Sequence, residues 1–90
     1  MFTSWGMESP RKFTEAEVAF CLTALDSGDY GAVLRAKGIV PAADGTWLHF
    51  DYVPGEQDIR TGAADYTGRL CVIGAQLNEA ALKTLFVGEA

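Results

Sequence analysis

The chain has 90 residues, 49% of them hydrophobic, and a formal net charge of −5 at pH 7. This length suits one small domain, and the composition is typical of a globular protein rather than a disordered one. The chain is acidic and contains no basic run, so it lacks the cations that bind nucleic-acid phosphates. No apolar run approaches the roughly 20 residues of a membrane-spanning helix. We therefore expect neither nucleic acid nor a membrane as a partner.

The two cysteines, Cys21 and Cys71, lie in separate apolar runs. We interpret both as buried free thiols, because nothing around them matches a secreted disulfide framework or the spacing of metal ligands. The N-terminus has no basic segment followed by an apolar one, so we expect no signal peptide and a cytoplasmic location.

The first elements are predicted to be a short strand over residues 2–7 and a helix over residues 15–27. Thr14 and Glu17 have the spacing of a capping box, which marks the start of this helix. Gly28 is a suitable left-handed residue at its end. The apolar stripe that would face the core consists of Val18, Cys21, Leu22 and Leu25.

Residues 31–40 predict a central strand, an apolar run with two cations set two positions apart. Successive side chains of a strand point to opposite faces of the sheet. One face would carry Leu34, Ala36, Gly38 and Val40, and the other Val33, Arg35, Lys37 and Ile39. We expect Leu34, Ala36 and Val40 to face the core, and Pro41 to mark the end of ladder hydrogen bonding.

An Asp-Gly pair, Asp44 and Gly45, predicts a hairpin turn before an alternating strand over residues 46–53. On this strand Leu48, Phe50 and Tyr52 point one way, and Trp47, His49, Asp51 and Val53 point the other. Residues 54–56 end the strand, and residues 57–61 can form a short edge strand.

Residues 62–68 read as a polar loop of small residues, and residues 69–75 as a strand that is apolar on both faces. Asn78 can cap a second helix that Gly88 ends. Its apolar stripe consists of Leu82, Leu85 and Phe86.

The predicted order is strand, helix, strand, strand, an optional short strand, strand, helix. This order predicts an α+β fold, one domain over residues 1–90, with two helices on one face of a largely antiparallel sheet of four to five strands. The other face would be open and would carry Arg35, Lys37, Trp47, His49 and Asp51, mixed with Val33, Val53, Cys71 and Ile73. We interpret this face as a docking surface, the alternative being an ordinary solvated face.

The sequence offers no catalytic residues that we can assemble into a site. A nucleophile and base pair would have to use His49, the only histidine, and nothing in the sequence brings a cysteine or serine to it. His49 and Asp51 share a face and are weak candidates for metal ligands, but two residues make an incomplete site. No phosphate-binding glycine motif occurs. A small-molecule pocket under the loop 62–68 is a further alternative.

Four segments together resemble the C-terminal domain of CobW-type proteins, in order and in spacing. They are Phe2-Thr-Ser-Trp-Gly6, Gly31-x-Val-Leu-Arg-Ala-Lys-Gly38-Ile-Val, Trp47-x-x-Phe50-Asp-Tyr-Val-Pro54-Gly55 and Gly68-Arg-Leu-x-Val-Ile-Gly74. Members of this family usually join a P-loop GTPase domain to this smaller domain. They are associated with GTP-dependent delivery of zinc or cobalt, as metallochaperones, and with cobalamin biosynthesis.

The resemblance implies a non-catalytic accessory or interaction domain, which is either excised from a longer protein or free-standing. The expected first strand begins at residue 2 with no linker before it, so we favour an excised domain. The GTPase motifs, the Cys-x-Cys-Cys metal motif and the histidine-rich segment of some members are absent here. GTP, zinc and cobalt are therefore implied only for the full-length family, and we expect no cofactor in this domain. The implied partners are the P-loop GTPase domain of the same protein and a client metalloprotein. Direct metal binding through His49 and Asp51 is the alternative function.

Overall fold

The computed structural model describes residues 1–88 as a five-stranded antiparallel sheet with the strand order β1-β5-β2-β3-β4 and helices on one face. The strands are β1 (Thr3–Ser9), β2 (Ala32–Pro41), β3 (Trp47–Val53), β4 (Glu56–Thr61) and β5 (Gly68–Ala75), and the helices are α1 (Glu15–Ala24), the short 3-10 helix η1 (Leu25–Ser27) and α2 (Glu79–Val87). The predicted α+β class and the short edge strand are confirmed. No helix within the described residues is long and apolar enough to cross a membrane.

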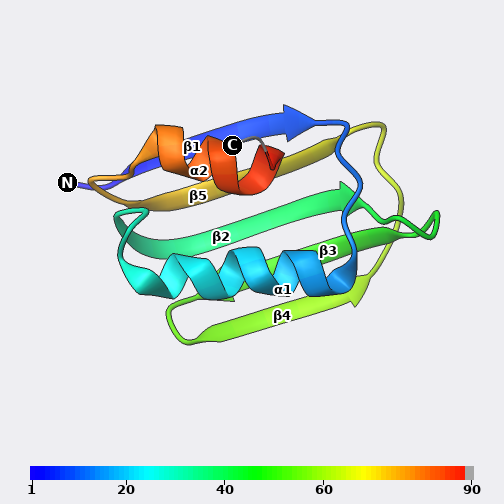
Figure 1. Cartoon of the computed structure of the whole chain (residues 1–90), viewed down its shortest axis with the longest axis horizontal. Helices are drawn as coiled ribbons and strands as arrows, with labels where there is room; N and C mark the ends of the chain where they lie inside the picture. Colours follow the sequence, from blue (N-terminus) through cyan, green and yellow to red (C-terminus); the bar gives the residue numbers. More distant parts are fainter. Residues whose placement is uncertain (89–90) are drawn as a thin grey trace.

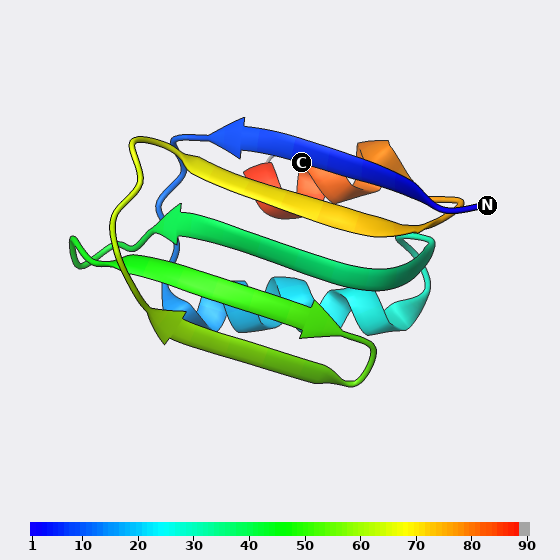
Figure 2. The same ribbon diagram turned by 180° about the vertical axis from the view of Figure 1, so that it is seen from behind.

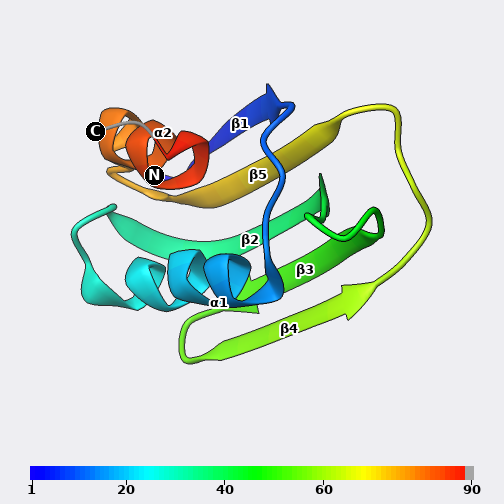
Figure 3. The same cartoon turned by 45° about the vertical axis from the view of Figure 1, so that its right-hand side comes forward.

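The two helices lie on the same face of the sheet, and the opposite face carries no helix (Figures 1 and 2). In Figure 3, α2 lies beside β1 and β5, whereas α1 runs beside β2, β3 and β4. We call the helix-free side the open face. The core between sheet and helices is apolar, and no polar or charged residue is buried in it within residues 1–88.

The start of α1 is fixed by the predicted capping box. The Thr14 side-chain oxygen accepts a hydrogen bond from the Glu17 N–H at 3.1 Å, and the Glu17 carboxylate accepts one from the Thr14 N–H at 2.8 Å. The α-helix ends at Ala24, so the prediction of one helix to Ser27 was too long, because the last residues tighten into η1. Gly28 follows in the left-handed conformation, with φ of 85°.

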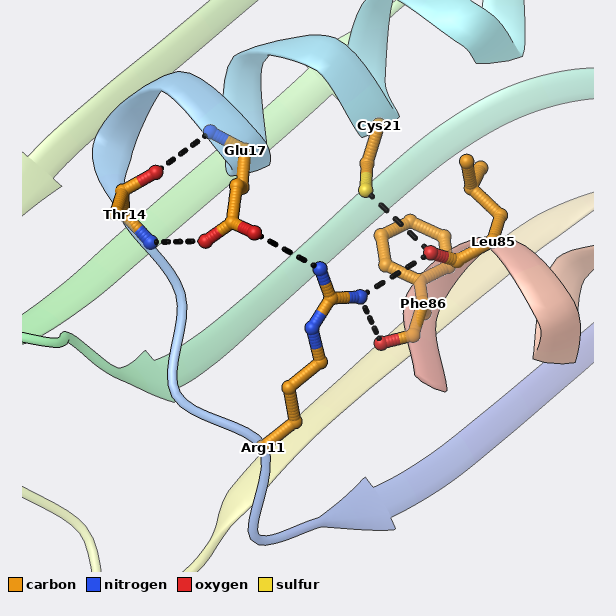
Figure 4. Close-up of polar contacts among 6 residues, drawn as sticks. All are labelled: Arg11, Thr14, Glu17, Cys21, Leu85 and Phe86. Carbon is orange, nitrogen blue, oxygen red and sulfur yellow. Dashed lines mark hydrogen bonds and ion pairs between the residues drawn. The ribbon is translucent and has the colours of Figure 1, made fainter. Parts of the chain in front are cut away.

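The side chain of Arg11 joins the segment before α1 to the end of α2 (Figure 4). Its Nη1 atom donates to the carbonyl oxygens of Leu85, at 3.3 Å, and Phe86, at 2.9 Å. Its Nη2 atom lies 3.4 Å from the Glu17 carboxylate. The last carbonyls of a helix lack partners within the helix and carry partial negative charge, so a guanidinium there stabilises the helix end.

A β-bulge in β2 changes which residues of that strand face the core. Val33 pairs with Gly74 and Arg35 pairs with Ile73, so Leu34 is an extra residue without a partner of its own on β5. The predicted faces of Val33 and Leu34 were therefore wrong: Val33 is buried in the core, and Leu34 is 43% exposed. Beyond the bulge the alternation holds, because Ala36 and Val40 are buried as predicted.

The middle of the core depends on the close approach of β2, β3 and β5. A Cβ atom at Gly38 would lie 2.6 Å from the Phe50 ring and 2.8 Å from the Leu70 Cβ. The absence of a side chain at Gly38 thus makes room for the Phe50 ring, which stacks on Phe86 of α2 with centroids 6.4 Å apart. Phe50 in turn ties the sheet to the helical layer.

Candidate docking surface

The five predicted surface residues lie on the open face. Arg35 and Lys37 come from β2, and Trp47, His49 and Asp51 come from β3. The residues between them in each strand are buried under the helices, so these five point the opposite way. Arg35 and Lys37 are exposed, whereas the three β3 residues are half-buried.

Asp51 is at the centre of a charged network on this face. Lys37 is directly opposite Asp51 in the β2–β3 register, but the carboxylate is paired with two arginines. Arg35 Nη2 lies 3.5 Å from Asp51 Oδ1, and Arg60 Nη1 lies 2.9 Å from Asp51 Oδ2. Arg60 Nη1 also lies 2.6 Å from Asp58 Oδ2. The hydrogen bond with Asp51 is the main cause that raises the pKa of Arg60, and the hydrogen bond with Asp58 adds to it.

The sequence prediction missed Arg60 and Asp58, which the turn between β3 and β4 brings to Asp51. Pro54 and Gly55 form a two-residue connection between the paired residues Val53 and Glu56, and Gly55 has φ of 78°. This register sets Asp58 opposite Asp51 and Arg60 opposite His49. Arg60 bridges two carboxylates that would otherwise repel each other. The Pro-Gly pair was the signal in the sequence that could have given this register.

The segment 62–67 covers part of the open face at the start of β3. His49 Nε2 lies 2.8 Å from the carbonyl oxygen of Ala63, and a Cβ at Gly62 would lie 2.6 Å from the His49 ring. The Gly62 N–H donates to the carbonyl oxygen of Trp47 at 3.0 Å. Figure 2 shows this segment running from β4 to β5 past that end of the sheet. His49 and Trp47 thus contact the loop 62–67, so they lie outside the most accessible part of the open face.

The loop is held at its other end by Asp65 and Arg69, whose side chains are 2.6 Å apart. Hydrogen bonds from the backbone N–H of Tyr66 and then from Arg69 lower the pKa of Asp65. Arg69 projects from β5 on the open face, and its guanidinium is paired with Asp65. This leaves Lys37 as the open-face cation with no ion-pair partner within residues 1–88.

The accessible centre of the open face lies between β2 and β5. A shallow hollow of about 220 Å³ is lined by Lys37, Gly38, Ile39, Arg69, Leu70 and Cys71. Ile73 on β5 is 40% exposed, and Val53 at the end of β3 is 41% exposed. Three of the four apolar residues predicted for this face, Val53, Cys71 and Ile73, are therefore on it, and Val33 is not.

The sequence profile of the family described as "Cobalamin synthesis protein cobW C-terminal domain" matches residues 2–88 of this chain. The chain belongs to this family. The match covers every strand and helix described above, so the open face is a feature of a CobW C-terminal domain.

Solved structures show the same fold at low sequence identity. The zinc-bound YjiA GTPase from E. coli is similar to this CobW C-terminal domain with a TM-score of 0.77 and 23% identity, over 99% of this chain and 30% of the YjiA chain. A zinc-bound triple mutant of the YjiA GTPase has a TM-score of 0.80 and 22% identity, over 97% of this chain and 29% of the other. The chain thus spans less than a third of these GTPases. A search of curated proteins found no match.

Metal binding by this CobW C-terminal domain finds little support in the geometry. In the part of the chain that the structure describes, no three His, Cys, Asp or Glu residues are grouped closely enough to hold an ion. The two candidate ligands are already engaged, His49 with the Ala63 carbonyl and Asp51 with two arginines. A metal ion would have to displace these contacts. Cys71 lies on the open face and Cys21 is buried among the helices, and both are free thiols.

Proposed function

We propose that this domain is a non-catalytic accessory domain that docks through its open face on the GTPase domain of its own protein. The observation that carries the proposal is the sheet face without helices, on which exposed apolar residues alternate with charges. Helices cover the other face of the same sheet (Figure 1). Surfaces that mix exposed apolar side chains with arginine are typical of protein interfaces.

Charge on the open face indicates what chemistry the partner surface would have. Four of the seven basic residues of this acidic chain are on this face: Arg35, Lys37, Arg60 and Arg69. The three arginines have carboxylate partners within the domain. We infer that Lys37 meets an acidic side chain of the partner, beside an apolar contact with Ile73 and the hollow between β2 and β5.

The proposed place of the domain is in a cytoplasmic protein that delivers zinc or cobalt in a GTP-dependent way, or serves cobalamin synthesis. GTP and the metal ion would be bound by the GTPase domain, and this domain would change its position or its client contacts with the nucleotide state. The family and the zinc-bound GTPases that share the fold support this role. A client metalloprotein is the second partner of the proposal.

The experiment is a calorimetric titration of the GTPase domain of the same protein with the 90-residue chain. Lys37→Glu should weaken binding by roughly tenfold or more, because it reverses a charge in the interface. Lys83→Glu is the matched control, since it makes the same charge change at an exposed position of α2 in the helical layer. Equal affinities for both variants, with both folded, would show that the open face is not the docking surface.

A further inference from the structure

The two edges of the sheet differ in their protection against pairing with another chain. The β4 edge carries three charged residues, Glu56, Asp58 and Arg60, which discourage a further strand. The β1 edge has one charged residue, Glu8, and no lysine, proline or bulge. Each of its seven residues pairs with β5 in an unbroken register, so β1 is regular along its full length.

The outer side of β1 has hydrogen-bonding groups available for a partner. A strand alternates its backbone groups between its two sides, and β5 uses one side only. Within the described residues, the additional hydrogen bond at β1 is made by the Ser9 side chain, which accepts from the Arg11 N–H at 3.1 Å. An edge of this kind is a template for strand addition.

We propose that two copies of this chain pair through their β1 strands, antiparallel, about a two-fold axis at Gly6. The sequence Thr-Ser-Trp-Gly-Met-Glu-Ser is nearly symmetric in residue character about its central glycine. With Gly6 opposite Gly6 of the second copy, Trp5 is opposite Met7 of the second copy. Ser4 is then opposite Glu8 of the second copy, so no like charges meet.

This register preserves the two faces of the sheet. Trp5 and Met7 are half-buried against the core in one copy. Pairing places Trp5 of each copy beside Met7 of the other copy, on the helical side of the sheet. Gly6 adds no side chain on the open side, so the backbones can approach. The helices of both copies lie on one side of a continuous sheet, and the proposed docking surface stays free in each copy.

A second copy suits this edge better than a segment of another protein, because both strands supply the same complementary pattern. The whole chain has a net charge of −5, so two copies repel each other. Glu8 is the one charge on the β1 edge, compared with three charged residues on the β4 edge. The contact between Trp5 and Met7 of the second copy would bury apolar surface of both side chains that is half exposed in a single copy.

The test is sedimentation equilibrium of the 90-residue chain over a wide concentration range. We expect a monomer–dimer equilibrium with a dimer of twice the 9.7 kDa monomer mass. Ser4→Lys would face Glu8 of the second copy and should strengthen dimerisation, whereas Ser4→Glu should weaken it. Each pair occurs twice in the dimer, so each change is expected to be roughly 2- to 30-fold.

The control places the same two charges at Ala43, an exposed turn residue far along the chain from β1. Ala43→Lys and Ala43→Glu report the effect of net charge alone. The double variant Ser4→Glu with Glu8→Lys should recover the association that Ser4→Glu loses. A monomer at all concentrations, or equal responses at Ser4 and Ala43, would overturn the proposal.

Discussion

The hydroxyl of Tyr52 donates a hydrogen bond to Asp26 Oδ1 at 2.5 Å, which links the core side of β3 to η1. The same carboxylate oxygen accepts from the Gly55 N–H at 3.0 Å, so Asp26 also holds the turn between β3 and β4. The Tyr52 side chain is buried in the core, with 2% of its surface exposed. The pair fixes the end of the first helix against the turn that sets the register of the open face.

Tyr52→Phe is expected to lower the free energy of unfolding by about 0.5–1.5 kcal/mol, because the buried ring stays and its hydrogen bond is lost. Urea denaturation measures this difference. Tyr66→Phe is the matched control, since Tyr66 is 83% exposed and should be nearly neutral. Equal effects of the two substitutions would show that the Tyr52–Asp26 bond does not contribute to stability.

The stabilisation from this pair should depend on pH at both ends of the range. Hydrogen bonds, first from Tyr52 and then from Gly55, lower the pKa of Asp26. The stabilisation by the Asp26 carboxylate is therefore present above about pH 3.9, the pKa of aspartate in the unfolded chain, and is lost as pH falls. Burial, and to a smaller extent the hydrogen bond with Asp26, raises the pKa of Tyr52. The free energy of unfolding therefore falls once pH exceeds about 10, the pKa of tyrosine in the unfolded chain.

Urea denaturation of wild type and Tyr52→Phe at a series of pH values tests this dependence. The difference in unfolding free energy should be constant from about pH 5 to 9 and should shrink outside that window. A difference that does not change with pH down to about 2 would contradict the role of the Asp26 carboxylate.

Arg11→Ala is expected to destabilise the protein by about 1–3 kcal/mol, because two helix-end carbonyls lose a charged donor. The last turn of α2 should exchange its amide hydrogens faster, which hydrogen-exchange mass spectrometry detects. Lys12→Ala removes a neighbouring exposed cation and should change stability little. If the two variants were equally stable, the contacts of Arg11 with α2 would not matter.

Local signals in the sequence predicted most of the fold. Thr14 with Glu17, and Asn78 with Gly88, marked the ends of helices because capping is a local interaction. The alternating apolar pattern of β3 predicted its buried residues, because successive side chains of a strand point to opposite faces of the sheet.

What the sequence did not reveal arises from pairing between strands. The bulge at Leu34 depends on the register of β2 against β5, which strict alternation ignores, and it exchanged the roles of Val33 and Leu34. The contact of His49 with Ala63 depends on where the loop after β4 runs. Part of the predicted docking surface, at His49 and Trp47, is therefore occupied by the protein's own chain.

Metal titration of the 90-residue chain addresses the alternative function. Zinc and cobalt are expected to bind no tighter than about 1 mM, because ligation by His49 and Asp51 would break their present contacts. Isothermal calorimetry measures the affinity, with His49→Gln as the comparison. Micromolar binding that His49→Gln abolishes would establish a metal site in this domain and contradict the expectation.

The two cysteines allow a direct readout of the open face. Burial raises the pKa of the thiol of Cys21, a residue of α1 with 2% of its surface exposed. Cys71 is half-buried and borders the hollow on the open face. A maleimide should therefore label Cys71 in the native protein, and Cys21 only after unfolding.

The most direct test of docking is the rate of Cys71 labelling with and without the GTPase domain of the same protein, followed by peptide mass spectrometry. We expect the bound GTPase domain to slow labelling of Cys71 strongly, and Lys37→Glu, but not Lys83→Glu, to remove this protection. Labelling of Cys71 at the same rate in the free domain and in a confirmed complex would contradict docking through the open face.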